Sequence, residues 1–263
     1  MRANPLKKKL LQGKPAFGTW LTLADEYVTR TLAKRAFDWL TVDLEHSAVD
    51  WKTAGSLVGW IAEAGSVPLV RVPWNDPVHI KRALDLGAFG LIIPMVNTPE
   101  EAAAAVRAAK YPPLGDRSAG RGMQTLTFDA SFQEYLNQAD DAIFIAAQIE
   151  SRQAVENAAA IAAVAGIDAL FVGPNDLRLR LSEPERHALQ EDFDAAIRRV
   201  IDAARKAGCA AGIHAADAEE ARHYADQGMT FIAVASDLAM LEAEADRRLR
   251  ILTQDRGIHN PAS

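Results

Sequence analysis

The stretch VPLVRVPWNDPVHIKRALDLGAFGLIIPMVNTPEEA, residues 67–102, contains an apolar run, a helical pattern, a second apolar run and the start of a second helix. Both runs are continuously apolar, which is typical of parallel strands covered on both faces. Between them Ile80, Ala83 and Leu84 share one helical face, and Gly87 follows where a left-handed helix cap is expected. The stretch therefore predicts two parallel strands joined by a helix.

The same alternation continues along the whole chain. Eight apolar runs separated by helical segments in about 250 residues are the usual content of a (β/α)₈ TIM barrel, and we expect this α/β fold. The rival is a doubly wound open sheet, which often has a glycine-rich phosphate turn. Neither G-x-G-x-x-G nor G-x-x-x-x-G-K-[ST] occurs here. The predicted strands are residues 16–21, 37–44, 67–72, 89–96, 142–149, 168–173, 209–214 and 231–236.

Helix boundaries have signals of their own. Thr98 and Glu101 fit a capping box, with a proline at the first helical position between them. A segment with apolar residues at helical spacing ends before Gly208, and two more helices are predicted to begin near Asp217 and Ser236.

We expect one domain over residues 1–263, because no linker, repeat or low-complexity tract divides the chain. Residues 1–14 form an N-terminal extension and residues 256–263 a C-terminal tail. Residues 110–141 interrupt the alternation. A long connection of this kind is usually functional, so we expect it near the active site or at a subunit interface.

Composition restricts the class of protein. The 263 residues include 29 Lys and Arg against 35 Asp and Glu, a net charge of −6, and 49% are hydrophobic. These values argue against disorder and against nucleic acid as the main partner. No apolar run approaches the ~20 residues that cross a bilayer, and no secretory signal is recognisable. With the single Cys209, the sequence predicts a soluble cytoplasmic protein without a disulfide framework.

Polar residues gather at the predicted strand ends. In a TIM barrel the active site lies at the carboxyl ends of the strands, so these residues are the candidates for function. In chain order they are Trp20, Asp43, Glu45, His46, Arg71, Asn97, Gln148, Glu150, Asn175, Asp176, His214 and Ser236.

Glu150 and Asp176 end consecutive predicted strands. Neighbouring strands lie about 5 Å apart, so both carboxylates could reach one hard cation such as Mg²⁺. The alternative is a helix N-cap for Asp176 and a solvated surface carboxylate for Glu150. The spacing leaves both interpretations open.

His46 follows Asp43 and Glu45 at the end of the second predicted strand. Histidine is a natural general base near neutral pH, and a neighbouring carboxylate can orient its ring. A hydrogen-bonded structural histidine is the alternative. Arg71 lies inside an apolar strand, where a cation is unfavourable unless it is paired or meets a ligand anion.

Two other chemistries are poorly supported. None of the lysines ends an apolar run, where the imine-forming lysine of a Schiff-base aldolase would be expected. No serine lies in a G-x-S-x-G pattern, which argues against a hydrolase of the Ser-His-Asp type. Cys209 begins a strand and is expected to be buried and inert.

Six segments together resemble the HpcH/HpaI aldolase family, the metal-dependent 2-oxo acid aldolases. They occur in the family's order over most of the chain, and the combination is highly specific, whereas GPNDL alone would be weak. The segments are DWLTVDLEHSAVDW (38–51), VPLVRVPWND (67–76), LIIPMVNTPEEA (91–102), KYPPLGDRSAG (110–120), AAQIES (146–151) and DALFVGPNDL (168–177).

The resemblance implies a TIM barrel that assembles as a homohexamer, often with the last helix exchanged between subunits. It implies reversible aldol cleavage of a 4-hydroxy-2-oxo acid to pyruvate and an aldehyde. A divalent metal, Mg²⁺, Mn²⁺ or Co²⁺, would be held by Glu150 and Asp176. His46 would be the base and pair with Asp85, and Arg71 would bind the substrate oxo group.

The substrate would be held by further residues that the resemblance implies. Gln148 would help to hold it, and Trp20 would form part of the pocket wall. Backbone N–H groups around Gly173, Asn175 and Asp176 would receive its carboxylate, as suits a loop that opens a helix. Pro174 has no N–H and would only shape that loop.

The sequence departs from the family pattern in two places. Arg178 and Arg180 follow GPNDL, where small residues are usual, and His214 replaces a common aliphatic residue. Both leave the acceptor aldehyde open, and a subunit-interface salt bridge is the alternative for the arginines. Three other functions remain: a citryl-CoA lyase-like enzyme, an oxaloacetate-decarboxylating enolate enzyme, and a non-catalytic barrel that binds a 2-oxo acid.

Overall fold

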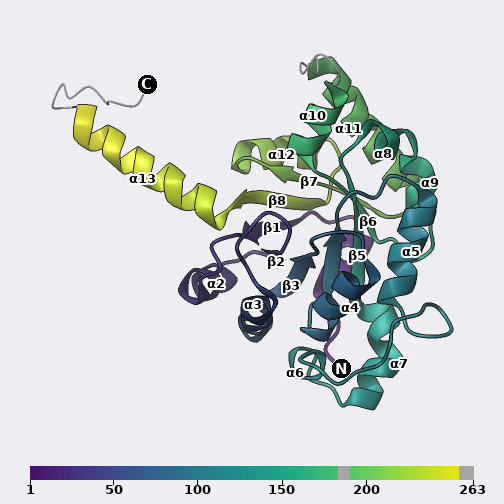
Figure 1. Ribbon diagram of the computed structural model, residues 1–263. Helices are drawn as coiled ribbons and strands as arrows, with labels where there is room; N and C mark the ends of the chain where they lie inside the picture. Colours follow the sequence, from purple (N-terminus) through teal and green to yellow (C-terminus); the bar gives the residue numbers. More distant parts are fainter. Residues whose placement is uncertain (183–189, 255–263) are drawn as a thin grey trace.

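A computed structural model describes residues 1–182 and 190–254 of the chain. Eight parallel strands close into a barrel in chain order, and β8 pairs with β1 (Figure 1). The TIM barrel prediction is confirmed, and each predicted run overlaps one strand, with β7 ending one residue beyond its run. The strands are β1 (Ala16–Leu21), β2 (Trp39–Asp43), β3 (Val67–Arg71), β4 (Gly90–Ile93), β5 (Phe144–Ile149), β6 (Ala169–Val172), β7 (Ala210–Ala215) and β8 (Phe231–Ser236).

Aromatic rings fill the barrel interior. The ring of Phe231 lies 4.5 Å from that of Trp39, 4.9 Å from that of Phe144 and 5.3 Å from that of Phe171, measured between centroids. Gly18 makes room for this packing, since a Cβ there would lie 2.1 Å from the indole of Trp39. The interior is therefore a packed core, and ligands can approach only at its ends.

Helices separate the strands, and several start or stop as predicted. Thr98 and Glu101 form the capping box of α5, Asp217 caps α12, and Gly87 and Gly208 have φ values of 93° and 77° after α4 and α11. The helices are α1 (Pro5–Leu11), α2 (Glu26–Ala33), α3 (Trp51–Glu63), α4 (Pro77–Asp85), α5 (Pro99–Ala109), α6 (Gln124–Thr127), α7 (Phe132–Ala142), α8 (Arg152–Glu156), α9 (Ala158–Ala162), α10 (Pro174–Leu181), α11 (Gln190–Ala207), α12 (Ala218–Asp226) and α13 (Asp237–Gln254).

The connection 110–141 lies at the amino ends of the strands. It contains α6 and most of α7, and the ring of Phe128 stacks on Phe89, next to the start of β4, at 3.9 Å between centroids. The backbone N–H of Arg2 donates to the carbonyl of Phe128 at 2.7 Å. The expected position beside the chain's own active site is therefore wrong, because apolar residues hold the segment at the opposite end. An interface position stays a prediction.

The two ends of the chain behave differently. In the N-terminal extension, the side chain of Asn4 donates to the carbonyls of Phe89 and Ala142, both at 2.9 Å, so α1 covers the amino end of the barrel. Helix α13 follows β8 and extends away from the barrel (Figure 1). The predicted tail 256–263 lies outside the described residues. No helix in the described part of the chain is long and apolar enough to cross a membrane.

Candidate functional site

A cavity of about 230 Å³ opens at the carboxyl ends of the strands, where the sequence predicted the site. Its walls come from strands all around the barrel and from the loops that follow them. The lining residues are Trp20, Thr22, Asp43, His46, Arg71, Gln148, Phe171, Gly173, Pro174, Asn175, Asp176, His214 and Ser236.

Arg71 is held in this cavity by a carboxylate on the neighbouring strand. Asp43 on β2 and Arg71 on β3 are register partners, and the guanidinium donates through Nε and Nη2 to both carboxylate oxygens of Asp43, at 2.8 and 2.7 Å. The third nitrogen, Nη1, lies 3.1 Å from Oε2 of Glu45, and the indole of Trp20 lies under the guanidinium at 4.3 Å. The largely buried cation is thus paired, and its fork is fixed in one orientation.

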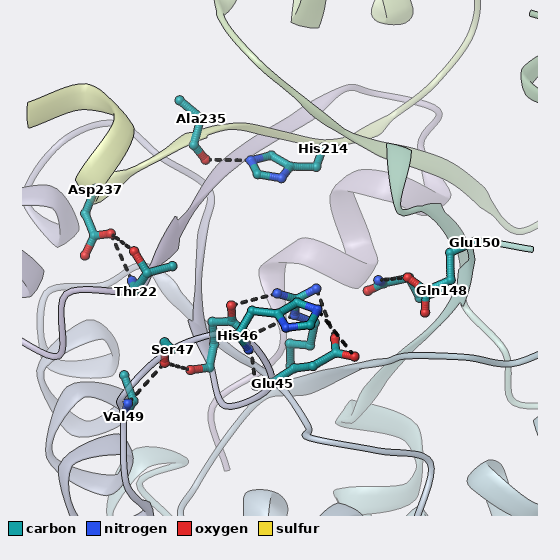
Figure 2. Close-up of polar contacts among 12 residues, drawn as sticks. Thr22, Glu45, His46, Ser47, Val49, Gln148, Glu150, His214, Ala235 and Asp237 are labelled. Carbon is teal, nitrogen blue, oxygen red and sulfur yellow. Dashed lines mark hydrogen bonds and ion pairs between the residues drawn. The ribbon is translucent and has the colours of Figure 1, made fainter. Parts of the chain in front are cut away.

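Asp43 also shapes the loop that presents His46. Its Oδ1 accepts the backbone N–H groups of Glu45, at 3.0 Å, and His46, at 3.4 Å. The hydroxyl of Ser47 donates to the carbonyl of Asp43 and accepts from the N–H of Val49 (Figure 2). The sequence indicated Asp43 only as a neighbour of His46. Its pairing with Arg71 depends on strand register, which sequence reasoning did not include.

The His46 ring is largely free, as a proton-transferring group requires. Its side chain is 63% exposed, and its Nε2 lies 3.8 Å from Oε1 of Glu45. Among the described residues the ring has no hydrogen bond that would hold it as a structural histidine, and its role as the base stays a prediction.

The predicted partner of His46, Asp85, is not in the cavity. Asp85 ends α4, on the amino side of the barrel, and its Oδ1 accepts from Nη2 of the buried Arg117 at 2.9 Å. The chain does not bring Asp85 and His46 together, because α4 runs from the carboxyl side of the barrel to the amino side. Their pairing stays a prediction.

Glu150 is a buried carboxylate rather than a solvated one. It is 2% exposed, its Oε1 accepts from the backbone N–H of Met95 at 2.6 Å, and its Oε2 accepts from Nε2 of Gln148 (Figure 2). Burial raises the pKa of Glu150, and the negative charge of Asp176 raises it further. A glycine is required at position 173, since a Cβ there would lie 2.7 Å from Oε2 of Glu150.

Asp176 lies in the first turn of α10 but does not cap it. The N-cap is Gly173, Pro174 is the first helical residue, and no side chain caps this helix. The carboxylate of Asp176 lines the cavity. Of the predicted backbone donors, the N–H of Gly173 is engaged with the carbonyl of Ile149 at 3.3 Å. Those of Asn175 and Asp176 therefore remain as candidates for binding a carboxylate.

The acidic groups in the cavity wall, Asp43 and Asp176, and those just behind it, Glu45 and Glu150, fit a divalent cation. Burial, together with the charges of Glu150, Asp43 and Asp176, raises the pKa of Glu45 to about 7, although Arg71 lowers it. These four carboxylates have one guanidinium among them, so a cation would relieve their repulsion. Within residues 1–182 and 190–254, no group of three or more His, Cys, Asp or Glu side chains is arranged to hold a metal. Glu150 and Asp176 would therefore be completed by water and substrate oxygens.

Arg178, Arg180 and Cys209, which the sequence also singled out, lie outside the cavity. The guanidinium of Arg178 stacks on the ring of Phe193 at 3.5 Å, and neither Arg178 nor Arg180 lines the cavity. Within this chain they do not contact the place of an acceptor, and a salt bridge at a subunit interface stays a prediction. Cys209 is half-buried, and burial raises the pKa of its thiol to about 11, consistent with an inert residue.

Comparison with known proteins gives one consistent result. The sequence profile of the HpcH/HpaI aldolase/citrate lyase family matches residues 16–243. A 4-hydroxy-2-oxo-heptane-1,7-dioate aldolase from Salmonella dublin is 40% identical over 246 residues, which are 92% of this chain and 92% of that protein.

Two solved structures are also similar over nearly the whole chain. An HpcH/HpaI aldolase/citrate lyase family protein from Burkholderia cenocepacia J2315 is 36% identical, with a TM-score of 0.88 over 95% of this chain and 99% of its own. An HpcH/HpaI aldolase from Desulfitobacterium hafniense DCB-2 is 34% identical, with a TM-score of 0.87 over 97% and 99%.

Proposed function

Because the chain belongs to the HpcH/HpaI aldolase/citrate lyase family, we propose that it is a divalent-metal-dependent pyruvate aldolase. The reaction would be the reversible cleavage of a 4-hydroxy-2-oxo acid to pyruvate and an aldehyde. The observation that carries the proposal is the cavity lined by Asp176, the paired Arg71 and the exposed His46, with the buried Glu150 directly behind its wall residues Gly173 and Gln148.

Glu150 on the β5 end and Asp176 on the β6 end would hold the metal. When bound, a divalent cation supplies Lewis acidity toward the substrate carbonyl. The protein orients the proposed metal ligands and leaves space beside them. Gln148 and the N–H of Met95 fix both oxygens of Glu150, and Gly173 leaves room beside them. The N–H groups of Asn175 and Asp176, at the start of α10, suit the substrate carboxylate.

Arg71 provides positive charge where the enolate oxygen of pyruvate develops negative charge. Asp43 orients the guanidinium through two hydrogen bonds, so little rearrangement is needed during the reaction. His46 would take the C4 hydroxyl proton during cleavage, directly or through one water, and a methyl proton of pyruvate during synthesis. Trp20 closes the wall under Arg71.

A pyruvate-release screen tests the proposal. The purified protein is given a series of 4-hydroxy-2-oxo acids, and separately oxaloacetate, with Mg²⁺, Mn²⁺ or Co²⁺, and pyruvate is followed with a coupled lactate dehydrogenase. We expect release from at least one of these acids. Release from oxaloacetate alone would instead identify a decarboxylating enzyme, and release from none would favour a non-catalytic binding barrel.

The substitution Arg71→Lys should lower the turnover number at least tenfold, about 1.4 kcal/mol of transition-state stabilisation. Lysine keeps the charge but cannot bond both oxygens of Asp43 and reach Glu45 with a third nitrogen, so the cation would no longer be fixed in its place. Arg107→Lys is the matched control, because Arg107 forms an exposed pair with Asp116 outside the cavity. Near-wild-type turnover of Arg71→Lys would assign Arg71 to structure alone.

We also infer that the chain forms a homo-oligomer, a hexamer as the family resemblance implies, in which α13 packs on another copy. Two observations support this. The helix extends away from the barrel and exposes apolar side chains, including Leu241 at 61% and Leu249 at 57%. A second hollow, of about 270 Å³, lies between α2 and the start of α13 and is lined mainly by apolar residues such as Leu23 and Met240. A second copy could cover both surfaces.

The double substitution Leu241→Glu and Leu249→Glu should therefore lower the particle mass. Light scattering after size exclusion should give a multiple of 28.5 kDa for the wild type and a smaller multiple for the variant. The control is Glu242→Gln, an exposed polar residue on the same helix. A monomeric wild type, or a variant of unchanged mass, would contradict this inference.

A further inference from the structure

One side of the cavity is not used by the proposed chemistry. The metal would lie at the ends of β5 and β6, and Arg71 and His46 belong to β3 and the loop after β2. The remaining wall comes from β7, β8 and β1 and contains His214, Ser236, Trp20 and, just after β1, Thr22. With pyruvate held between the metal and Arg71, this remaining wall, the β7–β8–β1 wall, is where an acceptor aldehyde would lie.

The His214 ring presents a hydrogen-bond acceptor on this wall. Its Nε2 lies 2.9 Å from the backbone carbonyl of Ala235, and a carbonyl can only accept, so Nε2 carries the proton. Burial and the nearby positive charge of Arg71 lower the pKa of His214, so the ring is neutral near pH 7. In a neutral ring Nδ1 then carries a lone pair and no proton. Figure 2 shows this nitrogen turned away from Ala235.

The ring is fixed in place by its neighbours. The His214 ring lies 5.5 Å from that of Trp20 between centroids, and Trp20 is itself held against Arg71 and against Phe171. Trp20 is 3% exposed and cannot turn aside without opening the core. Nδ1 has no hydrogen-bond partner among the residues that the structure describes. A ligand group that donates a hydrogen would supply one.

The rest of this wall does not suit an anion. The hydroxyl of Thr22 donates to Oδ1 of Asp237 at 2.7 Å, so Thr22 has only lone pairs left to offer. The carboxylate of Asp237 is 4% exposed and lies directly behind it. Among the described lining residues, the β7–β8–β1 wall includes neither Lys nor Arg. The donors left on this wall, Nε1 of Trp20 and the hydroxyl of Ser236, are neutral, and the nearby Arg71 is already paired with Asp43 and Glu45. A carboxylate on the aldehyde would thus meet no free cation there, whereas a hydroxyl would find an acceptor in Nδ1 of His214.

We propose that His214 selects neutral, hydroxyl-bearing aldehydes as acceptors by accepting a hydrogen bond from the aldehyde's hydroxyl group through Nδ1. The inference rests on the proposed pyruvate aldolase function. It separates this chain from the Salmonella dublin relative, which is named for a heptane-1,7-dioate, a compound with a carboxylate at each end. His214 is thus a specificity-determining residue that acts on the acceptor.

The test compares three aldehydes in the synthetic direction. Metal-loaded, full-length protein is given pyruvate with glyceraldehyde, propanal or succinate semialdehyde, and product formation is followed by chromatography. Glyceraldehyde and propanal have the same carbon chain and differ in two hydroxyl groups. We expect the wild-type kcat/KM to be roughly tenfold higher for glyceraldehyde than for propanal, the size of one useful hydrogen bond. The value for succinate semialdehyde should be below that for glyceraldehyde.

Two variants assign the preference to Nδ1. His214→Leu keeps apolar bulk beside Trp20 but has no acceptor, and its glyceraldehyde-to-propanal ratio should fall toward one, mainly through a higher KM for glyceraldehyde. His214→Asn places an amide oxygen close to the position of Nδ1, and it should retain most of the preference. The ratio is taken within each protein, so any loss of pyruvate activation cancels. Melting temperatures check the fold.

Three results would overturn the inference about His214 while leaving the aldolase function intact. A wild type that forms product but prefers succinate semialdehyde would overturn the inference and leave the aldolase intact. So would an unchanged ratio in His214→Leu, or an equal loss in His214→Asn at a wild-type melting temperature. If no aldehyde gives product with any of the metals, the proposed function fails, and this inference fails with it.

Discussion

Glu150→Gln should lower the rate of pyruvate release roughly 10³-fold, a loss of about 4 kcal/mol in transition-state stabilisation. The substitution removes one of only two protein carboxylates proposed for the metal. It also places an amide between Met95 and Gln148, each of which donates a hydrogen to Glu150. Turnover should be measured with the lactate dehydrogenase assay, and Mn²⁺ affinity by titration calorimetry.

The substitution Asp176→Asn tests the metal role without the disturbance of hydrogen bonds that Glu150→Gln would cause. The Asp176 side chain makes no hydrogen bond with the described residues, so asparagine changes the charge with little disturbance. We expect a comparable loss of rate and weaker Mn²⁺ binding. Glu63→Gln, an exposed acid at the end of α3, is the control and should match the wild type. Wild-type rates in both site variants would exclude the metal role of this pair.

His46→Ala should lower the turnover number by roughly 10²–10⁴, the usual contribution of general acid–base catalysis. The melting temperature should change little, because the side chain is 63% exposed and is not part of the barrel core. Affinity for pyruvate should be retained, since Glu150, Asp176 and Arg71 are untouched. Titration of pyruvate into the metal-loaded variant measures this affinity separately from turnover.

The result for His46→Ala distinguishes three roles. Lost turnover with retained pyruvate affinity identifies the base. Lost affinity, or a large fall in melting temperature, would make His46 a binding or structural residue instead. Unchanged turnover would move the base elsewhere. Glu45 is then the next group to test, since it lies beside Arg71 and burial raises its pKa to about 7.

The barrel could be predicted because its information is local. Each strand is a short continuous apolar run, and residues such as Thr98, Asp217 and Gly87 mark helix ends by their own chemistry. The strand ends were therefore predicted within two or three residues, and the polar groups just beyond them were recognised as the candidate site. The place of the segment 110–141 at the amino end of the barrel could not be predicted, for the complementary reason. Its position depends on the packing of Phe128 on Phe89, a contact between residues distant in sequence.

The arrangement inside the cavity was less predictable. Which strand-end side chains meet depends on register, as in the pairing of Asp43 with Arg71. Which nitrogen of the His214 ring carries the proton depends on the carbonyl of Ala235, 21 residues away on the next strand. The spacing of residues along the chain does not predict such contacts. The same limit explains why the suggested partner of His46, Asp85, came from resemblance and not from residue chemistry.

The exchange of pyruvate methyl protons with deuterated water tests the central claim most directly, because it needs no knowledge of the aldehyde. Metal-stripped protein is incubated with pyruvate in D₂O, with Mg²⁺, Mn²⁺ or Co²⁺ added in parallel, and deuterium uptake is read by mass spectrometry. We predict uptake with at least one metal, its loss with chelator, and its loss in His46→Ala. Undiminished uptake by the chelated protein, or no uptake with any of the metals, would contradict the account.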